Sequence, residues 1–122
     1  MEEFDIAIIG GGPAGIMAAI AASADLNIVL LEKNSSLGSK LLITGGGRCN
    51  ITNEKPIKKL LNSFHDKNFL KHSFYTFTNE MLLDLFRNRG LDFIVEDNNR
   101  VFPETEKSQD ILAILKYYLK DI

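Results

Sequence analysis

The feature that most constrains this chain is a glycine-rich turn between a short apolar segment and a stretch of good helix formers. Residues 6–9 are continuously apolar, which is typical of a parallel strand buried on both faces. They run into a G-x-G-x-x-G pattern at residues 10–15, and the alanine-rich residues 16–22 then favour a helix. A second predicted strand, residues 27–31, ends at Glu32. This order of strand, turn, helix and strand predicts a βαβ unit.

Each glycine of this turn has its own physical task. Gly10 permits a sharp turn out of the strand, Gly12 lets a pyrophosphate approach the backbone, and Gly15 lets the helix lie close to the sheet. The N–H groups and positive dipole end of the helix favour phosphate charge. Glu32 can accept hydrogen bonds from ribose hydroxyls, and a carboxylate there argues against a 2′-phosphate and hence against NADP. Spaced glycines alone are a weak signal, but in this context they predict a dinucleotide site.

A second glycine cluster follows, with the sequence TGGGRCNITN at residues 44–53. Three adjacent glycines are entropically costly to order, so they favour a place where the backbone passes against something flat or anionic. Arg48 offers a fixed fork of donors, and the asparagines Asn50 and Asn53 can orient a loop. From the residues alone, a flexible surface loop remains the alternative.

The rest of the chain predicts alternating helices and one hairpin. The predicted elements are a loop around the apolar residues 40–43, helices at 56–64, 66–75 and 79–89, hairpin strands at 93–96 and 100–102, and a last helix beginning near 105–108. Aromatic residues near the second of these helices could form a stacking surface, but core packing is the favoured interpretation. These residues are Phe64, Phe69, Phe74, Tyr75 and Phe77.

Charge and cysteine content exclude several classes of function. The formal net charge is −2, Lys and Arg look scattered, and Lys58-Lys59 is too short a run to predict a nucleic-acid or anionic-membrane surface. Cys49 is the single cysteine, which excludes an intrachain disulfide, a thiolate metal cluster and a two-thiol reductase. No metal-ligand spacing appears, and His65 and His72 lack a nearby acid or nucleophile. The acidic start and the glycine-broken apolar stretch disfavour a signal peptide or membrane span, so we expect a cytoplasmic protein.

Six segments together resemble one protein family. They are residues 10–15, 30–34, 37–41, 44–53, 77–80 and 100–103, and the most specific is TGGGRCNITN. The chain resembles the BaiN/RdsA-type (YhiN-like) flavoproteins, which are bacterial NAD(P)/FAD-dependent oxidoreductases. The resemblance implies an α/β fold, namely the N-terminal portion of a Rossmann-like FAD-binding domain of the glutathione-reductase type, with following helices and a β-hairpin. Members are several hundred residues long, so it also implies an incomplete chain.

The resemblance also assigns FAD contacts. Most members have Lys or Arg after Gly38, whereas this chain has Ser39, so the phosphate contact is expected from Lys40. The full set of implied contacts is Gly10, Gly12, Pro13, Ala14, Gly15, Glu32, Lys33, Lys40, Thr44, Gly45, Gly46, Gly47, Arg48, Cys49 and Asn50. Arg48 and the N–H groups of Gly46 or Gly47 are expected near the flavin, where they would stabilise negative charge on the reduced ring. No catalytic residue is assigned.

The expected organisation has three parts. Residues 1–55 form the dinucleotide-binding unit and flavin loop, residues 56–103 a helical segment and hairpin of the same domain, and residues 104–122 a helix leading into a substrate domain. The expected activity passes hydride from NAD(P)H through FAD to a small organic molecule, without nucleic-acid or membrane partners, and the fragment alone is expected to be inactive. Two alternatives remain open: a flavin-dependent nucleic-acid-modifying enzyme, and a truncated remnant that binds no flavin.

Overall fold

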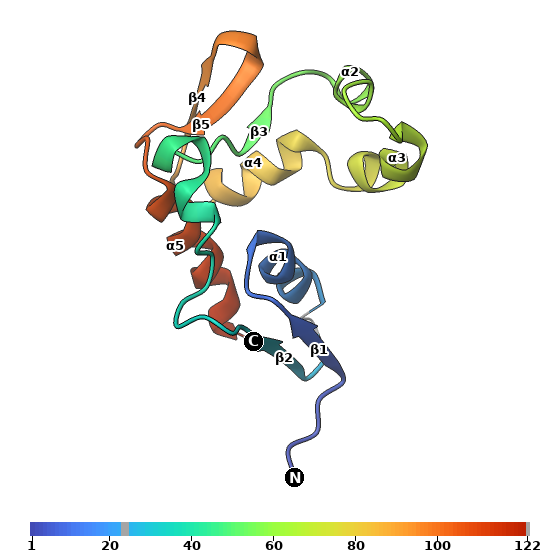
Figure 1. Cartoon of the computed structure of the whole chain (residues 1–122), viewed down its shortest axis with the longest axis vertical. Helices are drawn as coiled ribbons and strands as arrows, with labels where there is room; N and C mark the ends of the chain where they lie inside the picture. The colour runs from blue at the N-terminus through green and yellow to red at the C-terminus, as the bar shows by residue number, and fades with distance from the viewer. Residues whose placement is uncertain (23–24, 122) are drawn as a thin grey trace.

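A parallel βαβ unit opens the chain, as the sequence predicts. The computed structural model describes residues 1–22 and 25–121. Strands β1 (Ile6–Ile9) and β2 (Ile28–Leu31) pair in parallel, with Ile6 opposite Ile28 and Ile9 opposite Leu31. Helix α1 (Pro13–Ala22) connects them and packs on one face of the pair (Figure 1). The predicted α/β Rossmann-type unit is therefore confirmed.

The two parallel strands are not buried on both faces, in contrast to the prediction from their apolar sequences. Ile9 is 86% exposed and Leu31 is more than half exposed. The residues of β1 alternate between half-buried and exposed, because α1 covers one face and no other described element covers the second. The apolar residues 6–9 therefore predicted a strand correctly, but the prediction that both faces of this strand are buried was wrong.

Figure 1 shows a second, antiparallel sheet at the end of the molecule opposite the N-terminus, away from β1 and β2. It contains β3 (Thr52–Asn53), β5 (Arg100–Pro103) and β4 (Phe93–Glu96), in the order β3-β5-β4. The predicted hairpin is confirmed, and its turn is the short 3-10 segment η2 (Asp97–Asn99). Asn98 and Asn99 adopt positive φ angles of 63° and 59°, which asparagine tolerates better than most residues.

Four helices follow the βαβ unit, and each overlaps a predicted segment. They are α2 (Ile57–Leu61), α3 (Lys67–Thr76), α4 (Asn79–Arg87) and α5 (Ser108–Tyr118), which continues into η3 (Leu119–Asp121). The Thr78 hydroxyl accepts a hydrogen bond from the Met81 N–H at 3.2 Å and caps α4. Figure 1 shows α2 and α3 as a projection at the end of the molecule opposite the N-terminus.

The core joins α1 to α4, α5 and the second glycine cluster. Its buried members are Ile16, Leu41, Cys49, Phe86, Leu91, Ile111, Leu112 and Leu115. Helix α5 packs on α1 and on η1 (Leu41–Gly47), the 3-10 segment that contains the glycine cluster. The last helix therefore contributes to the same core as the βαβ unit, while the division into residues 1–55, 56–103 and 104–122 stays a prediction.

The aromatic residues around α3 do not fill this core. Phe69 is 80% exposed, and Phe64, Tyr75 and Phe77 are also exposed. Only Phe74 is half-buried, with its ring centroid 5.4 Å from that of Phe64. The expectation of core packing is therefore wrong for most of them, because α3 buries no residue and packs mainly on α2, which is short. Across the described ranges, no helix has the length and apolarity to cross a membrane.

Candidate functional site

The first glycine turn has the geometry that a bound phosphate group needs. Gly10 has a φ of +102°, and its N–H donates to the Leu31 carbonyl at 2.7 Å. A Cβ on Gly15 would lie 1.9 Å from the Gly10 carbonyl oxygen, so only glycine allows α1 to begin this close to the turn. A Cβ on Gly12 would meet no atom within 4 Å, so the backbone there faces open space. These are the features that let an anion approach a helix N-terminus.

Glu32 is held against this turn by two backbone groups. The Gly11 N–H donates to Glu32 Oε2 at 2.7 Å, and the Asn34 N–H donates to Oε1 at 2.8 Å. The hydrogen bonds from Asn34 and Gly11 hold the pKa of Glu32 below its usual range. The carboxylate is therefore ionised at neutral pH, and each oxygen keeps a lone pair that can accept from a ribose hydroxyl.

A hollow of about 340 Å³, called the cradle here, brings several predicted residues together. Its lining includes Gly10, Gly12, Pro13, Glu32, Lys33, Asn34, Ser39 and Lys40. Ser39 and Lys40 both line it, so the lining does not separate them as phosphate contacts. Ala14 and Gly15 lie in the first turn of α1 and are not among the lining residues.

A second cavity of about 260 Å³, called the inner cavity here, links the two glycine segments. Thr44, Cys49 and Asn50 from the second segment line it, together with apolar residues of α1, α4 and α5. Pro13 lines both the cradle and the inner cavity. The fold thus brings residues separated by about thirty positions to two hollows that share Pro13 at the start of α1.

The second glycine segment has a backbone that few other residues could adopt. Gly45, Gly46 and Gly47 all have positive φ, at 55°, 66° and 87°. A Cβ on Gly45 would lie 2.7 Å from the Asn50 backbone nitrogen, whereas Gly46 faces open space. Leu41 and Cys49 at the two ends of the segment are buried in the core, whereas residues 43–46 between them are exposed.

Arg48 lies against the antiparallel sheet and lines neither the cradle nor the inner cavity. Its Nη1 donates to Glu96 Oε1 at 2.6 Å and to Glu106 Oε1 at 3.0 Å. The guanidinium carbon also lies 4.0 Å from the centroid of the Phe102 ring. The Arg48 charge is therefore already paired with two carboxylates. In this structure the side chain links the second glycine segment to the antiparallel sheet and does not offer a free cation.

Comparison with known proteins places this fold in a family. The family described as HI0933-like protein Rossmann domain matches residues 4–122. The chain belongs to this family.

Curated members and more distant relatives share this region. A 3-dehydro-bile acid delta(4,6)-reductase of Clostridium scindens is 34% identical over 118 residues, covering 94% of this chain and 28% of the relative. A ribosomal RNA dihydrouridine synthase of Escherichia coli K12 is 33% identical, with the same coverages. A mitochondrial dihydrolipoyl dehydrogenase of Caenorhabditis elegans is 39% identical over 74 residues, which cover 60% of this chain and 13% of that protein. The chain thus spans a little over a quarter of the length of the bile acid reductase and of the dihydrouridine synthase.

Cys49 of this HI0933-like domain is a buried core residue. It is 3% exposed, and burial raises the pKa of its thiol, so the group is protonated at neutral pH. Its backbone N–H donates to the Thr44 carbonyl at 3.0 Å. Among the described residues, no three His, Cys, Asp or Glu side chains are grouped so that they could hold a metal ion.

Sequence reasoning missed Gly11, which the G-x-G-x-x-G pattern treats as a variable position. Its N–H holds Glu32, and its carbonyl accepts from the Gly38 N–H at 2.8 Å. A Cβ there would lie 2.3 Å from a side-chain carbon of Leu37. The run of three consecutive glycines was the available signal, because the pattern itself needs only two of them.

Proposed function

We propose that this chain binds FAD and forms part of an NAD(P)-linked flavoprotein oxidoreductase. The observation that carries the proposal is the Glu32 carboxylate, which the Gly11 N–H fixes in the same cradle as the open backbone of Gly12. An ionised acceptor beside an uncrowded helix N-terminus matches the needs of an adenosine ribose followed by a pyrophosphate.

Each part of the cradle has a defined role in this proposal. Glu32 accepts hydrogen bonds from the ribose, while Gly12 and the first N–H groups of α1 take the pyrophosphate charge. Lys33 and Lys40 add positive charge at the lining of the cradle. Thr44 and Asn50 line the inner cavity, which we assign to the flavin half of the cofactor.

The cradle alone suits any dinucleotide with a free 2′-hydroxyl. The choice of FAD rests on the resemblance of residues 44–53 to flavoproteins and on the reductases and dehydrogenases among the relatives. When bound, FAD supplies the redox chemistry that carries hydride from NAD(P)H to an organic acceptor, while the protein supplies binding and orientation.

The relatives support a cofactor role for this region more than a substrate role. Their names refer to a 3-dehydro-bile acid, to ribosomal RNA and to a dihydrolipoyl group, although each of them matches more than half of this chain. Because these proteins act on such different substrates, the region that they share is best explained by a common cofactor.

A titration with three dinucleotides tests the proposal. The purified protein should bind FAD more tightly than NAD⁺ or NADP⁺, as measured by calorimetry and by the visible flavin spectrum. Glu32→Ala should weaken FAD binding by about tenfold or more, because charge-assisted hydrogen bonds are lost. Glu104→Ala, at an exposed carboxylate outside the cradle, is the matched control. Absence of flavin binding would favour the remnant alternative, and unchanged affinity in Glu32→Ala would refute the assigned role of the cradle.

A further inference from the structure

Positive charge is concentrated in the projection formed by α2 and α3. Residues 55–76, called the basic lobe here, hold five lysines against one aspartate, a formal charge of +4. The remaining residues therefore carry −6 to give the net −2 of the chain. The mild overall charge hides this separation, and the expectation that Lys and Arg are scattered does not hold in the folded chain.

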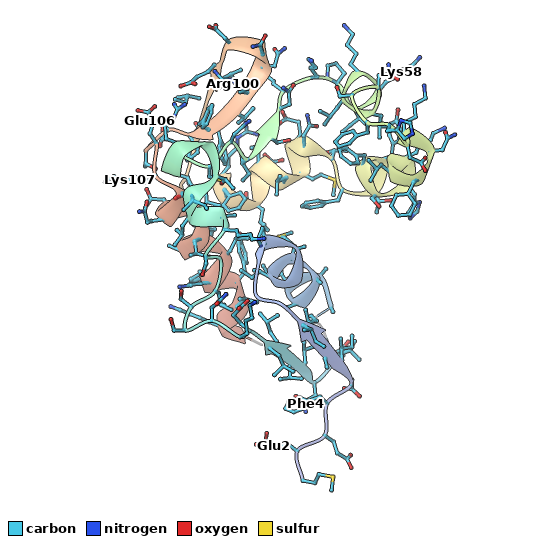
Figure 2. All side chains as sticks on the ribbon, viewed as in Figure 1. Glu2, Phe4, Lys58, Arg100, Glu106 and Lys107 are labelled. Carbon is cyan, nitrogen blue, oxygen red and sulfur yellow. The ribbon has the colours of Figure 1, made fainter. Side chains whose placement is uncertain are left out.

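Three of these lysines surround one hollow. Helices α2 and α3 pack together, and a hollow of about 340 Å³ between them is lined by Lys58, Lys67 and Lys71 with Asn62, Asn68 and Tyr75. Lys67, Lys71 and Tyr75 follow each other at intervals of four residues, so they share one face of α3. Figure 2 shows Lys58 on α2, at the end of the molecule opposite the N-terminus and far from β1 and β2.

No carboxylate of the described residues neutralises these lysines. The ion pairs of the described chain involve Arg48, Arg87 and Arg100, and none includes a lysine of the basic lobe. Asp66, the one acid of the lobe, accepts a hydrogen bond from the Phe69 N–H at 3.0 Å and caps α3. Lys58, Lys67 and Lys71 are exposed, so their mutual repulsion is relieved when a polyanion supplies the opposite charge.

We propose that this hollow binds a single strand of nucleic acid. Three lysines from two helices line this one hollow, and lysine ammonium groups bind the phosphates of a nucleic-acid backbone. The Tyr75 ring is 52% exposed on the lysine face, where a base can stack on it. Asn62 and Asn68 offer amide donors and acceptors for base edges.

The same groups disfavour a membrane surface as the partner. An amphipathic helix that lies on a bilayer needs apolar anchors flanked by its lysines. Phe69 is the most exposed apolar side chain of α3. It lies two residues after Lys67, so it points to a different face of the helix from Lys67 and Lys71. The lysine face instead carries asparagine and tyrosine. This proposal goes beyond the FAD site and does not depend on it.

Fluorescence anisotropy with labelled 12-nucleotide RNA and DNA strands of mixed sequence tests the proposal in the absence of FAD. The triple variant Lys58→Ala/Lys67→Ala/Lys71→Ala should bind about 100-fold more weakly at 0.1 M salt, because each lost phosphate contact removes about 0.7 from the slope of log affinity against log salt. Tyr75→Ala should weaken binding by about 5- to 150-fold, and Tyr75→Phe should restore it. Lys107→Ala/Lys116→Ala/Lys120→Ala, at exposed lysines outside the lobe, should bind as the unmodified protein does.

Three results would overturn the proposal. The first is equal nucleic-acid affinity in the two triple variants, with circular dichroism showing that both are folded. The second is lysine-dependent binding to vesicles of 70% phosphatidylcholine and 30% phosphatidylserine without binding to either strand. The third is complete displacement of the strands by millimolar inorganic phosphate, which would assign the hollow to a small anion. FAD titration of the same preparations reports separately on the proposed function.

Discussion

Arg48 and Glu96 form a two-pronged ion pair that joins the second glycine segment to the antiparallel sheet. Nη1 lies 2.6 Å from Glu96 Oε1, and Nη2 lies 3.3 Å from Oε2. Glu106 accepts a further bond from Nη1, and Figure 2 shows it near the 3-10 segment that precedes Arg48. Arg48 and Glu96 lie 48 residues apart in the sequence. Their ion pair helps to fix the position of the second glycine segment, which lines the inner cavity.

Replacing either partner of this pair should loosen the loop. We expect Arg48→Ala and Glu96→Gln to lower the melting temperature in the same direction, by a few degrees, because the pair is partly exposed to water. Arg48→Lys should recover only part of the loss, since an ammonium cannot make the two-pronged contact. Thermal melts measure the stability, and the visible spectrum of bound FAD is the second readout. A spectral change in Arg48→Ala that is absent in Glu96→Gln would show instead that Arg48 acts on the flavin directly.

Replacement by alanine should lower the stability of the protein at Gly15 but not at Gly12. Gly15→Ala forces a methyl group to within 1.9 Å of the Gly10 carbonyl, so we expect a loss of stability of more than about 3 kcal/mol in urea denaturation. Gly12→Ala meets open space and should leave the unfolding free energy nearly unchanged. The same Gly12→Ala variant should nevertheless lose FAD affinity, because its methyl group fills the path of the pyrophosphate. Full FAD affinity in a folded Gly12→Ala protein would contradict this assignment.

Stability should fall in acid through Glu32 and Glu96. Both carboxyls have a pKa lowered from 4.5 in the folded protein, Glu32 mainly by the Asn34 N–H and Glu96 mainly by Arg48. The folded state thus binds fewer protons than the unfolded one, so the contribution is complete above about pH 4.5 and is lost as pH falls through the folded pKa. Urea denaturation between pH 3 and pH 7 should show a smaller pH dependence in Glu32→Gln and Glu96→Gln. Glu104→Gln should retain the full dependence.

The Cys49 thiol should be unreactive in the folded protein. Burial raises its pKa from the ordinary 9.0, so little thiolate forms at neutral pH and reagents have little access. We expect slow reaction with a thiol-specific disulfide reagent at pH 8 and a fast reaction in urea. The raised pKa also means that its contribution to stability is complete below pH 9 and is lost as pH rises further. Rapid labelling of the native protein would show that the loop opens more readily than its packing implies.

Elements set by nearby residues could be predicted well from the sequence. The glycine turn, α1 and the asparagine turn of the hairpin follow from residues close together in the chain. The parallel pairing of β1 with β2 spans 22 residues, but the βαβ pattern predicts it. Local hydrogen bonds also cap α4, from the Met81 N–H to Thr78 at its start and from the Asn88 N–H to the Asp84 carbonyl at its end. Predictions that needed a distant partner were less successful, as for the exposed Phe69 and the exposed face of β1.

The sequence by itself determined the βαβ unit, the dinucleotide-type turn and its acidic partner Glu32, because backbone sterics and periodicity act over a few residues. Only the tertiary structure decided that Arg48 faces Glu96 and that Gly11 holds Glu32. It also decided that Lys58 meets Lys67 and Lys71 around one hollow. The physical reason is the same in each case: ion pairs, hydrogen bonds and shared cavities depend on where the chain returns in space, and local preference does not encode that path.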